Sequence, residues 1–94
     1  MTTTNITSTL TVNTRHVVNL VSYINQISTG SVMIRKFSND VDRQVNARTV
    51  IGVLSLTIRK GDLLTISCYD NNEDEEKLTV AKITKWFEDN KEDS

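Results

Sequence analysis

The sequence predicts an α+β protein in which helices cover one face of an antiparallel sheet. In several short segments apolar residues alternate with polar ones, as half-buried strands require. In other segments apolar residues recur every three or four positions, as the buried face of a helix requires. The two kinds of segment follow one another along 94 residues in the order β-α-β-β-α-β-α, and elements in that order form an antiparallel sheet with helices on one side.

The first strand and the first helix lie in the N-terminal third of the chain. Ile6, Leu10 and Val12 sit at even spacing among threonines, which predicts a half-buried strand. Asn13 or Thr14 is the expected N-cap of the following helix, because either side chain can accept a hydrogen bond from its first turn. The apolar stripe of this helix consists of Val17, Leu20, Val21, Ile24 and Ile27.

A pair of strands joined by a turn is predicted in the middle of the chain. Gly30 ends the first helix, and Val32 and Ile34 begin the second strand. Ser38-Asn39-Asp40 has the composition of a turn. The third strand then alternates at Val41, Arg43 and Val45.

The second half of the chain contains a short helix, a strand and a long helix. Thr49 stands at the start of the short helix, and Lys60-Gly61-Asp62 forms the turn that leads into the strand. The short helix is marked by Val50, Val53 and Leu54, and the strand by Leu64, Ile66 and Cys68. Residues 71–76 open the long helix with acidic side chains, which the helix macrodipole favours at that end. Its apolar stripe is Val80, Ile83 and Phe87, with Leu78 and Trp86 alongside.

Composition and charge narrow the class of protein. The chain is 37% apolar, as an ordinary globular protein is, and its net charge of −1 predicts no bulk attraction to nucleic acid or to anionic membranes. Its single cysteine, Cys68, excludes an intrachain disulfide and a paired-cysteine metal site. No apolar run approaches the roughly 20 residues of a membrane span, and residues 1–5 lack the features of a signal peptide. We therefore expect one monomeric, cytoplasmic domain over residues 1–94, with frayed tails at 1–5 and 89–94 and without metal or cofactor.

One block of the sequence resembles a known family. Residues 45–56 read VNARTVIGVLSL, and Lys60-Gly61-Asp62 and the strand over residues 63–67 follow them. This block is similar to the second half of HPr, the small histidine phosphocarrier of the bacterial sugar phosphotransferase system. The resemblance spans residues 6–87. It implies a four-stranded, open-faced β-sandwich with three helices on one face.

The resemblance directs attention to the start of the first helix. HPr carries its phosphate on the histidine of a His-x-Arg-Pro-Ala motif, and the matching segment here is Asn13-Thr14-Arg15-His16-Val17. Arg15 fits the motif, but Asn13 replaces the histidine. An asparagine amide has no basic lone pair that could accept a phosphoryl group. Asn13 and Arg15 are therefore expected to form a degenerate phosphohistidine site, in which Asn13 acts as a helix cap.

His16 is the only histidine and allows two interpretations. It could be a displaced phosphoacceptor, or a surface residue that contacts a partner. Three positions along a helix rotate a side chain by about 300° and raise it by about 4.5 Å. That displacement would take the imidazole away from the place of the original histidine, which favours the second interpretation.

Thr49 and the short helix complete the candidate site. In many HPr proteins a serine at the matching position is phosphorylated by a kinase, and a variant named catabolite-repression HPr lacks the active histidine and keeps this regulatory role. Thr49 is thus a candidate for regulatory phosphorylation, with Arg15 or Arg48 as partners for the phosphate; it can equally be a plain N-cap. Val50 and Ile51 cannot easily both be buried, because neighbours on a helix point about 100° apart.

The expected partner-binding residues are Thr14, Arg15, His16, Arg48, Val50, Ile51 and Leu54.

Three functions remain open at this stage. The first is a non-catalytic regulator that binds phosphotransferase-system enzymes, HPr kinase or a transcriptional regulator. The second is a working phosphocarrier that uses His16. The third is an HPr-like interaction domain recruited to an unrelated protein.

Overall fold

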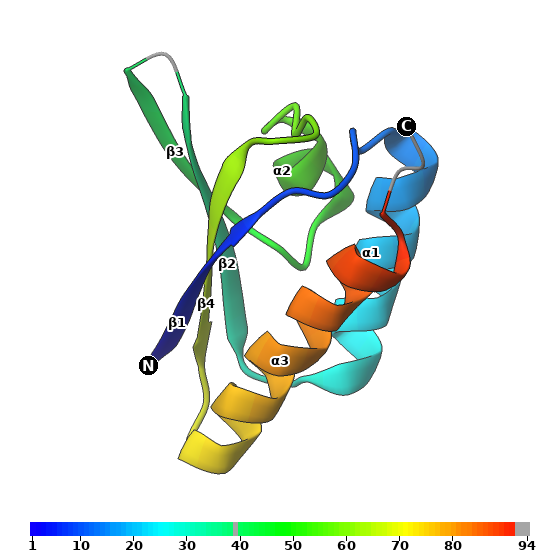
Figure 1. Cartoon of the computed structure of the whole chain (residues 1–94). Coiled ribbons are helices and arrows are strands. Elements are labelled where there is room, and N and C mark those ends of the chain that lie inside the picture. Colours follow the sequence, from blue (N-terminus) through cyan, green and yellow to red (C-terminus); the bar gives the residue numbers. More distant parts are fainter. Residues whose placement is uncertain (39, 92–94) are drawn as a thin grey trace.

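Seven elements follow one another in the predicted order β-α-β-β-α-β-α (Figure 1). The computed structural model describes residues 1–38 and 40–91. The strands are β1 (Thr2–Thr7), β2 (Ser31–Ser38), β3 (Val41–Asn46) and β4 (Leu63–Tyr69), and the helices are α1 (Thr14–Ile27), α2 (Val50–Leu54) and α3 (Glu73–Asp89).

The four strands form one antiparallel sheet in the order β1-β4-β2-β3. β4, the last strand in sequence, lies between β1 and β2. All three helices lie on one side of the sheet, and the other side is open (Figure 1). The predicted α+β class and the open-faced sandwich with three helices on one face are therefore confirmed.

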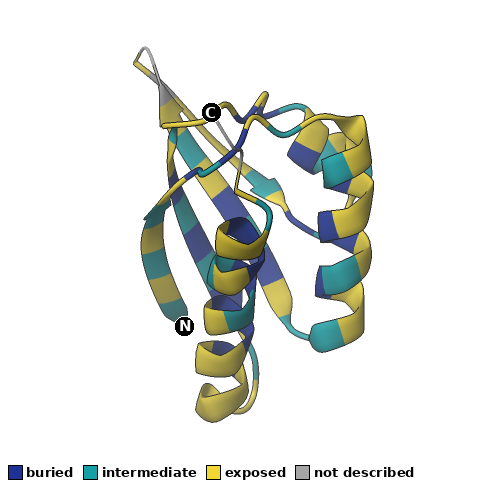
Figure 2. Ribbon diagram, turned by 45° about the vertical axis from the view of Figure 1, so that its right-hand side comes forward, coloured by how far each residue is buried: buried dark blue, intermediate teal, exposed yellow. Residues whose placement is uncertain are grey.

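The core lies between the sheet and the inner faces of the helices (Figure 2). The stripe predicted for α1 is buried except for Ile27, which is only partly buried. In α3 the predicted stripe is buried as well, and Trp86 joins it, whereas Leu78 is exposed. Trp86 can be buried because its indole N–H donates to Asn19 Oδ1 at 2.9 Å, which leaves no polar atom of the ring unpaired.

The first strand is shorter and begins earlier than predicted. β1 covers Thr2–Thr7 and pairs with β4 from Thr2 opposite Cys68 to Thr7 opposite Leu63. The expectation of a frayed segment over residues 1–5 is therefore wrong for residues 2–5, whose threonines are good strand formers. Leu10 is buried and Val12 partly buried, yet both lie in the connection to α1. Their even spacing reflects two separate contacts with the core and no strand.

At the other end, α3 includes Asp89, and residues 92–94 of the expected C-terminal tail lie outside the described residues. In the predicted turn between β2 and β3, Asp40 adopts a left-handed φ of 64°, and Asn39 lies outside the described part of the chain. Within the described residues, no helix is long and apolar enough to cross a membrane.

One buried carboxylate joins the first strand to the start of the last helix. The side chain of Glu76, only 3% exposed, accepts hydrogen bonds from the Asp70 backbone N–H at 2.8 Å and from the Thr2 hydroxyl at 3.0 Å, and the Met1 ammonium lies 3.4 Å away. The Asp70 N–H is the main cause that lowers the pKa of Glu76, against the opposing effect of burial, with Thr2 and the Met1 ammonium adding to it. The ionised carboxylate therefore holds β1, the β4–α3 connection and α3 together.

A lowered pKa makes this contribution depend on pH. Because Glu76 ionises more easily when folded, its stabilisation is present above the unfolded pKa, about 4.3, and is lost as pH falls through the folded value. We expect Glu76→Gln to lower the melting temperature at pH 7, and the gap to the wild type to shrink as the pH approaches 3. Thermal unfolding at several pH values measures this, with Glu75→Gln on the exposed neighbour as a control. A difference in melting temperature that stays constant with pH would mean that Glu76 stabilises the fold through packing and neutral hydrogen bonds, and not through its charge.

Candidate functional site

The start of α1 is closed by a reciprocal pair of hydrogen bonds. Asn13 is the N-cap, and its Oδ1 accepts the His16 backbone N–H at 3.0 Å. In return, the Asn13 backbone N–H donates to His16 Nδ1 at 3.3 Å. This arrangement is a capping box, in which the third helical residue reaches back to the cap; here an imidazole takes the place of the usual Glu or Gln. Of the two N-cap candidates, Asn13 is the one the fold uses.

The capping box determines what the imidazole of His16 can do. A neutral imidazole has one nitrogen with a free lone pair, and the other nitrogen carries the proton. Since Nδ1 accepts the Asn13 N–H, the lone pair points at the backbone and not toward a reactant. Sequence reasoning missed this role, although the spacing of three residues from Asn13 is the signature of a capping box.

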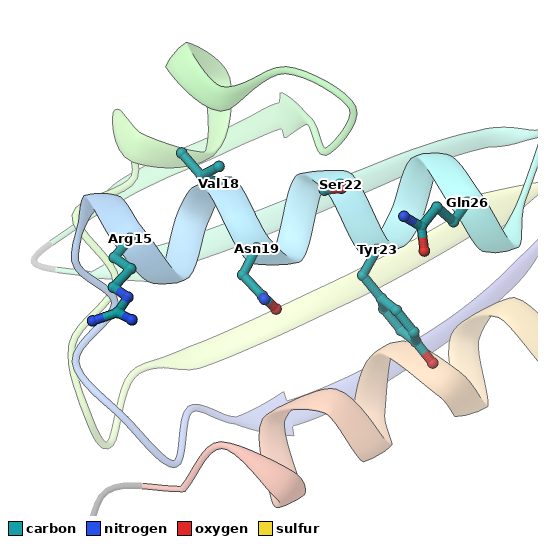
Figure 3. Close-up of a pocket in the computed structure, with 6 residues that line it drawn as sticks. All are labelled: Arg15, Val18, Asn19, Ser22, Tyr23 and Gln26. Carbon is teal, nitrogen blue, oxygen red and sulfur yellow. The ribbon is translucent and has the colours of Figure 1, made fainter.

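Arg15 lies on the exposed side of the first turn, at one end of an open groove along α1 (Figure 3). Within the described residues no hydrogen bond or ion pair holds its guanidinium, so it is available to a partner. The residues that line the groove are Arg15, Val18, Asn19, Ser22, Tyr23 and Gln26. Asn19 is fixed in it by the indole N–H of Trp86.

Arg48 lies elsewhere and is engaged in the fold. Its Nε donates to the Gly30 carbonyl at 2.8 Å, and its terminal nitrogens bond to Asn25 Oδ1 at 2.8 Å and to the Ser28 carbonyl. Arg48 thus joins the end of α1 to the segment before α2, and its positive charge stabilises the C-terminal end of α1. Its guanidinium is occupied by hydrogen bonds within the fold, so it is not free to bind a partner or a phosphate.

Thr49 begins α2 as expected. Its Oγ1 accepts the Gly52 N–H at 3.2 Å and donates to the Asn46 carbonyl at 3.3 Å, while the residue remains exposed. Gly52 is required for this close approach, because a Cβ there would lie 2.6 Å from Thr49 Oγ1. The hydroxyl is therefore both a working cap and accessible from solvent.

Exposed apolar side chains gather where α1 and α2 pack together. Val50 is partly buried against the core, whereas Ile51 is 83% exposed and Leu54 41% exposed, so only one of the neighbours Val50 and Ile51 faces inward, as predicted. Val18 on α1 is 50% exposed and points toward α2 (Figure 3). Sequence analysis missed Val18, which adjoins the buried stripe at Val17.

We call Arg15, Val18, Ile51 and Leu54 the docking surface.

The two helices that form the docking surface carry no carboxylate. The sequence contains no Asp or Glu in residues 1–39 or in residues 43–61, which include both α1 and α2. Arg15 is therefore the only fully charged side chain on these two helices. An apolar surface with an unpaired arginine and no carboxylate suits a partner that offers apolar and acidic groups.

Among residues 1–38 and 40–91, no three His, Cys, Asp or Glu side chains are grouped to hold a metal ion. Cys68 is buried, and burial raises the pKa of its thiol, which keeps it protonated and unreactive. Cys68 therefore acts as a small hydrophobic residue of the core.

The geometry of this fold and of the capped α1 agrees with a family comparison. A family model described as "PTS HPr component phosphorylation site" matches residues 2–89. The chain belongs to the PTS-HPr family. Members of this family are phosphocarriers of the phosphotransferase system and not enzymes in themselves. A search of curated protein sequences finds no match.

Solved HPr structures share the fold. The chain is similar to HPr-C-His from Thermoanaerobacter tengcongensis, with 20% identity and a TM-score of 0.68 over 94% of this chain and 97% of that one. It is also similar to the histidine-containing phosphocarrier protein of a mycoplasma, with 17% identity and a TM-score of 0.67 over 87% of this chain and 90% of that one. The resemblance predicted from residues 45–67 is thus confirmed for the whole fold.

Proposed function

We propose that this PTS-HPr protein is a non-catalytic regulatory module, which acts in the bacterial cytoplasm by binding other proteins through its docking surface. The observation that carries the proposal is the capped start of α1, where Asn13 occupies the position to which the HPr resemblance assigns the phosphorylatable histidine. The side chain that could have replaced it, His16, uses its lone pair in the capping box. The helix start is therefore stable without being nucleophilic.

The second hypothesis, phosphotransfer through His16, would need the capping box to open. Nδ1 would have to lose the Asn13 N–H and turn outward, or the proton on the other nitrogen would have to leave. Either change disturbs the first turn of α1, whose cap stabilises a helix by about 1 kcal/mol. The geometry thus favours binding over transfer.

Phosphotransfer gives the direct test. We expect no acid-labile phosphate on the protein after incubation with phosphoenolpyruvate and the first enzyme of the phosphotransferase system, because no free basic nitrogen faces the site. An active HPr is the positive control, and radiolabel or intact mass is the measurement. Labelling that is lost in His16→Ala would establish the second hypothesis. We expect Asn13→His to restore weak acceptance at most, since His16 and Val17 differ from the Pro-Ala of the motif.

The docking surface indicates the chemistry of the partner. Ile51, Leu54 and Val18 present exposed apolar side chains, and Arg15, about one turn before Val18 on α1, supplies a free cation. A complementary protein would offer an apolar hollow with a carboxylate at its rim. Phosphotransferase-system enzymes, an HPr kinase and a transcriptional regulator are the partners that the family suggests.

Substitution of Ile51 tests the docking surface. Because its side chain is 83% exposed, Ile51→Asp should change the free energy of unfolding by no more than about 0.5 kcal/mol, yet abolish capture of the partner. The matched control is Leu78→Asp, which places the same charge at an exposed leucine on α3. Capture of phosphotransferase-system proteins from native lysate, read by mass spectrometry, gives the binding result. Equal loss of binding in both variants would remove the docking surface from the proposal.

The identity of the captured proteins separates the first hypothesis from the third. Phosphotransferase-system proteins or their regulators would support a role in sugar metabolism. Capture of an unrelated protein that depends on Ile51 would instead indicate a domain recruited to another process.

Thr49 is the proposed site of regulation. Its hydroxyl is exposed at the start of α2, where a kinase could reach it. A phosphate there would add nearly two negative charges beside the docking surface and alter the sign of its field. Arg48, once expected as a partner for that phosphate, is engaged with Asn25, Ser28 and Gly30, which leaves Arg15 as the remaining candidate.

A kinase assay tests Thr49, whereas stability does not. Thr49→Ala should cost about 1 kcal/mol through the lost cap whether or not the residue is ever phosphorylated. We expect an HPr kinase to add one phosphate, located at Thr49 by mass spectrometry and absent in Thr49→Ala. An unmodified protein under conditions that fully modify a control HPr would leave a plain binding module.

A further inference from the structure

The shortness of α2 raises the question of what holds it in place. The helix has five residues, far fewer than the roughly 12–15 that an isolated helix needs. Val53 is its only fully buried side chain, and its last turn contains no basic residue of its own. The carbonyls of its last turn are satisfied locally, by the N–H groups of Ser55, Leu56 and Thr57 and by the Ser55 hydroxyl, so the next carbonyls along the chain are the ones that need donors from elsewhere.

The donors to the carbonyls at and just after the C-cap, Ser55, come from the β2–β3 hairpin. Lys36 Nζ donates to the Leu56 carbonyl at 3.0 Å and to the Thr57 carbonyl at 2.8 Å, and it forms an ion pair with Asp62 Oδ2 at 2.9 Å. These three acceptors match the three hydrogens of an ammonium, and the Lys36 side chain is only 13% exposed. From β3, Arg43 adds a longer bond of 3.4 Å to the Ser55 carbonyl.

The two cations occupy an otherwise unfavourable position. Lys36 and Arg43 are direct cross-strand partners, and like charges in that position repel. The repulsion is offset because both donate to backbone carbonyls at or just after the C-cap of α2, and because Asp62 adds a full negative charge. The two neighbouring cations are therefore stabilised by the backbone carbonyls and the carboxylate that they bind.

The backbone just after α2 also depends on this contact. Thr57 has a φ of 50°, a left-handed conformation that is rare for a β-branched residue. Its N–H donates to the Leu54 carbonyl at 3.2 Å, and its own carbonyl is the closer acceptor of Lys36. The contact with Lys36 therefore stabilises the turn that ends the helix beside Leu54.

Asp62 completes the arrangement on the other side. Burial opposes ionisation of Asp62, but hydrogen bonds from the Arg59 backbone N–H at 2.8 Å and from Lys36 outweigh it, so the pKa of Asp62 is lowered. Asp62 stays ionised at neutral pH and keeps the counter-ion of Lys36 in place. The network therefore joins β2, the end of α2 and the turn before β4.

We infer that Lys36, assisted by Arg43, is the positioning residue of the docking surface, because it caps the turn that follows α2 and so fixes where Ile51 and Leu54 stand. The inference that this position matters for binding rests on the proposed function of the docking surface. The capping itself can be measured without any partner.

Amide hydrogen exchange measures the capping. In Lys36→Met, which keeps the aliphatic stem but has no donor, we expect the amides of Ser55, Leu56 and Thr57 to exchange about tenfold faster through local opening. Lys36→Arg should restore most of the protection, and Arg43→Met should have a smaller effect because its bond is long and exposed. Ile83→Val, a change in the core on α3, should not speed the exchange of these three amides more than that of other amides.

Binding is the second readout, with the first enzyme of the phosphotransferase system and HPr kinase as probes. For whichever probe the wild type binds, Lys36→Met should weaken binding about tenfold and Lys36→Arg should restore it. Faster exchange without any loss of binding, or no change in exchange, would overturn the inference. If Lys36→Met exchanges faster but the wild type binds neither probe, the capping role is supported and the proposed function is not. If Lys36→Met does not fold, Asp62→Asn replaces it, because it removes the counter-ion but keeps an acceptor for Arg59.

Discussion

The central position of β4 is the constraint on which the rest of the structure depends. Because β4 pairs with both β1 and β2, its inward side chains lie in the core between sheet and helices, and Leu64, Ile66 and Cys68 are almost completely buried. The chain must therefore cross the sheet twice through helices before its last strand can insert. That crossing leaves α1 and α2 packed against each other at the surface, which creates the docking surface.

The start of α1 shows what the fold requires of the position that Asn13 occupies. The position of Asn13 asks for a short polar side chain that accepts a hydrogen bond from the first turn. The amide oxygen of Asn13 accepts that hydrogen bond, and the imidazole of His16 completes the cap by accepting the Asn13 N–H. The stability of this helix start therefore needs no nucleophilic side chain at residue 13.

Local patterns predicted most of the fold, and contacts between distant segments account for what they missed. The apolar stripes of α1 and α3 recur every three or four residues, and the cap at Thr49 involves residues close in sequence. The sequence alone therefore predicted them. Leu10 misled the assignment of the first strand, because even spacing does not distinguish a strand from two separate core contacts.

Long-range partners explain the remaining differences at the candidate site. Arg48 looked like a surface residue, since nothing near it in sequence shows that the end of α1 supplies its acceptors. Lys36 was overlooked for the same reason: its acceptors lie about twenty residues away. The capping role of His16 was the one missed feature with a local signal.

The uneven distribution of charge has a kinetic consequence. A net charge of −1 suggests a nearly neutral protein, yet α1 and α2 carry no carboxylate and α3 begins with four acidic residues. In the field of an acidic partner, such a molecule turns before contact so that Arg15 leads and the start of α3 trails. The rate of encounter would then fall as ionic strength rises, while the lifetime of the complex, set by the apolar contacts of Ile51 and Leu54, would change little.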